Sequence, residues 1–153
     1  MQVQCPLYLL TSTAACWKCS RSQSVVALGA CSIVEEGKAV SDPEGPTDLF
    51  FLTAITSMPA EVFECVVLRN PRYTLRHSRA SESTYYCNTC ECGAHFGDFY
   101  LFSRPGGAFF PETEAGAARI NYRRLPFTGA LPFECSWSQG MGGFILTHRM
   151  IEP

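Results

Sequence analysis

The stretch TAACWKCS, residues 13–20, places Cys16 and Cys19 two residues apart. A second cluster lies far along the chain in YCNTCECGA, residues 86–94, which contains three more cysteines. Tetrahedral zinc favours four thiolates, supplied as two close pairs that each hold the ion from one tight turn. The two clusters therefore predict a metal site that joins distant parts of the chain, and that site decides the fold.

The second pair has two possible registers. Cys87 with Cys90 keeps the two-residue gap of the first pair, whereas Cys90 with Cys92 puts Gly93 after the last ligand, where a turn needs a residue that tolerates positive φ. Residues i and i+2 share one face of an extended strand, so Cys90 and Cys92 can face the same ion. We favour this register and keep Cys87 as an alternative ligand. The preferred ligands of a structural Zn²⁺ are Cys16, Cys19, Cys90 and Cys92.

Redox chemistry and histidine ligation are the competing interpretations. A redox pair at Cys16 and Cys19 would need a helix starting at the motif to lower a thiol pKa, but the following residues, SRSQSVVAL, favour a strand. His95 closely follows the second cluster and could replace one thiolate. His77 and His148 lie in strand-like runs, and we expect them to be structural.

Length and composition indicate one folded domain. The chain has 153 residues, of which 46% are hydrophobic and 17% charged, enough to bury a sizeable core. We expect a single zinc-binding domain over residues 1–153, with a zinc-ribbon-like core in residues 1–110 and appended strands and loops in residues 111–153.

The cysteine pattern also bears on localisation. Nine cysteines, several of them clustered, favour metal ligation in a reducing compartment over a set of disulfides, so we expect a cytoplasmic protein. No apolar run approaches the ~20 residues of a membrane-spanning helix, which predicts no membrane association. A lipid anchor at Cys16 is disfavoured because MQVQC carries no positive side chain and the apolar run at residues 6–10 is short.

Local patterns predict an α+β fold. Strands are expected at residues 3–11, 25–34, 49–56, 73–78, 83–87 and 96–103, with an exposed loop at 35–48.

A short amphipathic helix is expected within residues 57–71, with Ser57 as its N-cap and Asn70-Pro71 as its stop. Residues 112–122 predict one or two helical turns, and the tail predicts small strands such as residues 144–148. The expected architecture is a mainly antiparallel sheet with one short helix and a zinc-ribbon-like two-knuckle metal site.

The second cluster and its surroundings resemble a known group of proteins. YCNTCECGAHFGDFYL, residues 86–101, is similar to the second knuckle of small, uncharacterised bacterial and phage zinc-ribbon-like proteins, and the likeness extends to CWKC, LTAITSMP and PGGAFFP within residues 1–110. The positions that match the motif are Tyr86, Asn88, Cys90, Gly93 and Asp98. The resemblance implies structural zinc with Cys90 and Cys92 as the second pair, although here one residue rather than two separates them.

The function we expect is that of a non-enzymatic, zinc-stabilised protein that acts through contacts with another protein. The sequence contains no G-x-S-x-G or H-E-x-x-H signature, and a four-thiolate zinc site has no open position for a substrate.

Two alternatives remain. A nucleic-acid-binding module would use Arg119, Arg123 and Arg124 with Tyr122 as a phosphate and stacking patch, although the net charge of −2 argues against it. The weaker alternative is a small enzyme whose cleft would hold His95, Asp98 and Tyr100.

Overall fold

A computed structural model describes residues 1–40, 49–138 and 150–151 of the chain, with the last two described by their backbone only. The strands are β1 (Gln2–Ala15), β2 (Ser22–Glu35), β3 (Lys38–Ala39), β4 (Phe50–Ser57), β5 (Thr74–Ser78), β6 (Ser83–Thr89), β7 (His95–Phe96), β8 (Asn121–Arg124), β9 (Ala130–Pro132), β10 (Glu134–Ser138) and β11 (Met150–Ile151). The helices are α1 (Ala60–Arg69), the π-helical turn η1 (Phe99–Ser103) and α2 (Glu114–Ala118). The predicted strand at 144–148 lies outside the described residues. No helix in the described ranges is both long and apolar enough to span a bilayer.

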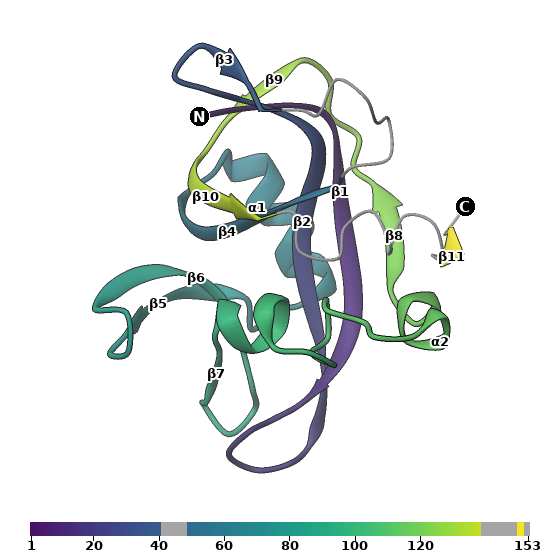
Figure 1. Cartoon of the computed structure of the whole chain (residues 1–153). Coiled ribbons are helices and arrows are strands. Elements are labelled where there is room, and N and C mark those ends of the chain that lie inside the picture. The colour runs from purple at the N-terminus through teal and green to yellow at the C-terminus, as the bar shows by residue number, and fades with distance from the viewer. Residues whose placement is uncertain (41–48, 139–149, 152–153) are drawn as a thin grey trace.

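The long hairpin of β1 and β2 runs the length of the molecule (Figure 1). Its antiparallel register extends from Gln2 opposite Val34 to Ala15 opposite Ser22, so the first cysteine pair occupies the connecting turn. The central residues 25–30 of β2 are all buried, which is the pattern of a strand covered on both faces. The two predicted strands flanking the first cysteine pair are confirmed as a hairpin, and both are longer than expected.

The hairpin is the centre of the main sheet. Within the described residues the strand order is β10-β4-β2-β1-β8-β11, with β3 added to β2 and β9 added to β1. Almost all pairings are antiparallel, the exception being β11 with β8. A smaller sheet of β5, β6 and β7 carries the second cysteine cluster. The predicted mainly antiparallel architecture is confirmed.

Alternate residues of the hairpin face two separate cores. Leu10 and Phe51 belong to one cluster, which also contains Phe96 and Phe109. Leu9 and Val26 belong to the other cluster, which includes Val62 and Val66 of α1. Leu28, Phe50 and Phe133 are further members of that second cluster. Because successive side chains of a strand point to opposite faces, this pairing of neighbours shows that both faces of the sheet are covered.

The predicted strand at residues 96–103 is wrong beyond Phe96. The chain leaves β7 and forms η1, in which the backbone N–H of Arg104 donates to Phe99 O (3.0 Å). Leu101 and Phe102 are both buried while Phe99 is 74% exposed, an arrangement that a strand with alternating sides does not give. A run of aromatic residues has high strand propensity, and here packing of Phe102 against other aromatic rings overrides it.

The predicted helix at 57–71 forms as α1, but its start is different. Ser57 is the last residue of β4 and does not cap the helix; Pro59 occupies the N-cap position without a side-chain hydrogen bond. The C-terminal stop at Asn70 is confirmed. Ser57 pairs with Glu134 of β10, and α1 begins only at Ala60, so Ser57 lies two positions before the N-cap and too far from the first turn to cap it.

A buried asparagine joins the two sheets. Asn88 is 3% exposed; its Oδ1 accepts from Val26 N (2.9 Å) and its Nδ2 donates to Val26 O (2.9 Å). The amide thereby supplies the two hydrogen bonds that a neighbouring strand would give at this point of β2. Asn70 Nδ2 also donates to Asn88 Oδ1 (2.8 Å) and to Ser24 O (3.2 Å), which ties the end of α1 to the same place.

Asn88→Ala is expected to lower the free energy of unfolding by about 3 kcal/mol, because it leaves the buried backbone groups of Val26 without partners. Urea unfolding of the metal-loaded protein measures this loss, with the exposed Thr84→Ala on the same strand as the control, expected within about 0.5 kcal/mol of the parent. Equal unfolding free energies for the two variants would contradict the role of the amide.

Candidate metal centre

The first cysteine pair lies in the tight turn that closes the main hairpin. The backbone N–H of Cys16 donates to Arg21 O (2.8 Å), and that of Ser20 donates to Cys16 O (2.9 Å). Ser20, directly after Cys19, has φ of 64°. The backbone N–H of Lys18 points at Cys16 Sγ (3.4 Å). The turn thus directs backbone donors toward a sulfur atom, as a thiolate requires.

The second turn, between β6 and β7, has a matching form. The backbone N–H of Cys90 donates to Ala94 O (2.8 Å), and that of Gly93 donates to Cys90 O (2.9 Å). Gly93 follows Cys92 with φ of 90°, and a Cβ there would meet no atom within 4 Å. Glycine is therefore favoured by its backbone conformation and not by lack of space.

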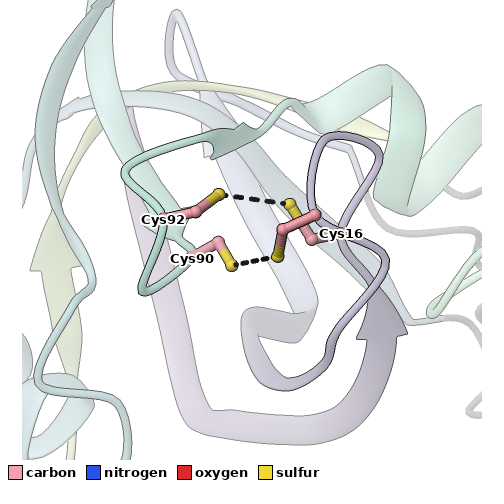
Figure 2. A group of neighbouring side chains, drawn as sticks. Cys16, Cys90 and Cys92 are labelled. Atoms are coloured by element: carbon pink, nitrogen blue, oxygen red, sulfur yellow. Dashed lines mark hydrogen bonds between the residues drawn. The ribbon is translucent and has the colours of Figure 1, made fainter.

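The two turns bring four sulfur atoms together (Figure 2). Cys16 Sγ lies 3.7 Å from Cys92 Sγ, and Cys19 Sγ lies 3.6 Å from Cys90 Sγ. All four sulfurs lie within 4.8 Å of one another. Zn–S bonds of ~2.3 Å in a tetrahedron give sulfur separations of about 3.8 Å, and disulfide bonds would be far shorter at ~2.05 Å. The cluster therefore has the dimensions of a site that could hold a metal ion.

The cluster comprises the four preferred residues and leaves the alternative ligand outside it. Cys87 is buried, and burial raises the pKa of its thiol to about 11. Its side chain lines a small cavity of about 10 Å³ beneath the main sheet, together with Asn88 and Asp98. His95, the other candidate, also lies outside the group of four: its Nε2 accepts from Arg76 Nε (2.8 Å).

The pKa values of Cys16 and Cys90 are shifted in opposite directions. The backbone N–H of Cys19, then that of Lys18, lowers the pKa of the Cys16 thiol to about 6 against the opposing effect of burial. At Cys90 the backbone N–H of Cys92 acts in the same direction, but burial and the neighbouring thiols outweigh it and raise the pKa to about 12. The Cys16 thiolate therefore forms readily, whereas ionisation of Cys90 is opposed by its surroundings and would be favoured by a cation at the centre.

Side chains outside the cluster brace the two turns against each other. Trp17 Nε1 donates to His95 O (2.7 Å), which joins the first turn to β7. Glu91 in the second turn forms ion pairs with Arg21 (3.1 Å) and Arg72 (3.0 Å). Both ion pairs are exposed and contribute little individually, so a metal ion held by the four sulfurs would be the stronger connection.

The residues proposed for an enzymatic cleft are separated by the fold. His95 lines an open groove beside the cysteine turns, and Asp98 lines the small cavity beneath the main sheet. Tyr100 donates from its hydroxyl to Ala15 O (2.6 Å) and lines a third recess. Asp98 Oδ2 accepts from Ala54 N (2.6 Å), so this carboxylate supports a residue of β4 that has φ of 46°.

The residues proposed for nucleic-acid binding share one region but not one face. Arg123 and Arg124 are exposed on β8, and Arg119 follows α2. Tyr122 is buried and its ring stacks on Tyr8 with centroids 4.2 Å apart. A ring held in this way cannot stack on a base. Of the remaining histidines, His77 contacts Thr84, and His148 lies outside the described residues.

Comparison with known proteins adds no relative: no family model, curated protein or solved structure matches the chain.

The cluster predicts which cysteines hold the metal. Cys92→Ser is expected to weaken metal affinity more than about tenfold, because it removes a ligand atom, whereas Cys87→Ser should retain full metal content. Elemental analysis and titration with cobalt, whose visible bands report thiolate coordination, measure both. Loss of metal from the Cys87→Ser protein with retention in Cys92→Ser would reverse the assignment.

Asp98 predicts a pH dependence of stability. Burial raises the pKa of its carboxyl group from 3.8 to about 6. Between these values the folded chain holds a proton that the unfolded chain has lost, so stability falls as the pH rises through this window. Asp98→Asn should therefore become the more stable protein above pH ~6, by up to about 3 kcal/mol. Urea unfolding at a series of pH values with saturating metal tests this; a difference that stays constant from pH ~4 to ~7 would contradict it.

Proposed function

We propose that this chain is a non-enzymatic protein in which one structural zinc ion stabilises a zinc-ribbon-like pair of knuckles, and that it acts through contacts with another protein. The observation that carries the proposal is that four sulfurs from two distant turns lie within 4.8 Å of one another. Four thiolates fill the coordination sphere of zinc and leave no position for a substrate or for a reactive water. The metal is thus assigned to stability.

Zinc is favoured over other metals by the ligand set. Thiolate ligands in tetrahedral arrangement select zinc or iron–sulfur chemistry, and a single ion accounts for sulfurs within 4.8 Å of one another. The resemblance of residues 86–101 to bacterial and phage zinc-ribbon-like proteins supports the same assignment. Unbonded cysteine thiols at this site fit a cytoplasmic, reducing location.

Exposed apolar side chains support a role in protein contacts. Leu68 on α1 is 82% exposed and Phe99 on η1 is 74% exposed. Trp17, between Cys16 and Cys19, is 61% exposed although its indole N–H is bonded. Aromatic residues of this kind are enriched at the centres of protein interfaces.

Removal of zinc provides the test. We expect one zinc per chain in the purified protein by native mass spectrometry. Chelation should lower the free energy of unfolding by more than about 5 kcal/mol, because a four-thiolate zinc site contributes ~10–16 kcal/mol of binding free energy to the folded state. A protein purified without any metal, or one whose unfolding is unchanged by chelator, would contradict the proposal.

A further inference from the structure

An open groove of about 800 Å³ lies beside the cysteine turns, and we call it the knuckle groove. One side is formed by β5 and the turn after it, the other by the two cysteine turns and β7. Its principal lining side chains are Trp17, Lys18, Arg76, Arg79, Tyr85 and His95. The groove is thus built from three segments that are distant in sequence, two of which carry the proposed zinc ligands.

The charge of the knuckle groove differs from that of the whole chain. Lys18, Arg76 and Arg79 line it, whereas its lining contains no aspartate or glutamate. The complete chain has a net charge of −2. Glu91, in the second turn, is already paired with two arginines that lie outside the lining. The groove is therefore a cationic recess on an acidic protein, which favours an anionic occupant.

The walls of the groove are held in place before any ligand binds. Arg76 donates to His95 Nε2 (2.8 Å) and to Gly93 O (3.2 Å), which fixes its guanidinium against the second turn. These bonds use two of its five N–H donors. The indole N–H of Trp17 is fixed by His95 O (2.7 Å) while 61% of the residue stays exposed. Such fixed side chains lose little entropy on binding.

The kind of anion follows from the balance of charge and aromatic surface. Single-stranded nucleic acid is held by several stacked rings and a long cationic track. Here Trp17 is well exposed but Tyr85 is buried at 9% exposure, so the groove offers one exposed indole and three cations, beside the smaller imidazole rings of His77 and His95. Arginines beside a single exposed indole match a peptide with paired carboxylates and one apolar side chain.

We propose that the knuckle groove binds a short acidic segment of a partner protein, with carboxylates at Arg76, Arg79 and Lys18 and an apolar side chain against Trp17. This inference rests on the proposed function and names the surface and the partner chemistry that it requires.

Selection from a random peptide library with the zinc-loaded full chain tests the proposal, followed by titration of selected synthetic peptides by fluorescence anisotropy. We expect enriched sequences to share two or more Asp or Glu residues beside one apolar residue. Arg79→Glu and Lys18→Glu should each weaken binding about tenfold, since each replaces an attraction by a repulsion. Arg124→Glu makes the same charge change outside the groove and should alter affinity less than about twofold.

Three results would overturn the proposal: no enrichment, enriched peptides without acidic residues, or acidic peptides whose affinity is unaffected by Arg79→Glu and Lys18→Glu. Tighter binding of a single-stranded oligothymidylate or oligouridylate, lost in the same variants, would assign the groove to nucleic acid instead. Zinc content measured on each variant separates the two proposals. Full zinc with no peptide binding rejects the groove alone, whereas absence of zinc from the parent protein rejects the proposed function.

Discussion

The contact between two cysteine turns is the constraint on which this fold depends. Cys16 and Cys92 meet across 76 positions of sequence, and Cys19 and Cys90 across 71. Closing a loop of that length costs about 4 kcal/mol of chain entropy. Sulfur–sulfur hydrogen bonds are weak and cannot offset this cost, and β7 has only two residues with which to hold its turn. A thiolate-bound zinc ion, at ~10–16 kcal/mol, is large enough to stabilise the closure.

Besides the cysteines, two polar side chains attach the segment from β6 to η1 to the main sheet. Asn88 bonds both backbone groups of Val26 in β2, and Asp98 accepts from the backbone of Ala54 in β4. Each replaces a ladder hydrogen bond at a place where the main sheet is irregular or unpaired. The segment from β6 to η1 is therefore held by Asn88, by Asp98 and by the cysteine cluster. Of these three contacts, the cysteine cluster is the one that could hold a metal ion. Cys16 and Cys90 themselves are buried in the apolar cluster that contains Leu10 and Phe51, so the cysteine cluster is continuous with that core.

The sequence predicted the parts of this structure that depend on neighbouring residues. Apolar runs around Cys16 and Cys19 indicated the hairpin, and the need for positive φ after Cys92 correctly singled out Gly93. Features set by distant partners were not predictable in the same way. Asn88 matched a motif position, but its role depends on a backbone 62 positions away. The π-helical turn follows from how Phe102 packs in the core, whereas the local aromatic run indicates a strand.

The two proposals are linked because the knuckle groove and the candidate metal site share residues. Trp17 lies between Cys16 and Cys19, and the acceptors that fix Trp17 and Arg76 belong to Gly93 in the second turn and to His95 in β7 just after it. The geometry of the groove therefore requires that the two turns be held together. By thermodynamic reciprocity, a peptide that binds only the assembled groove must raise the metal affinity by the same factor by which the metal raises its own. The proposed structural zinc would thus also set when the surface beside it is competent to bind.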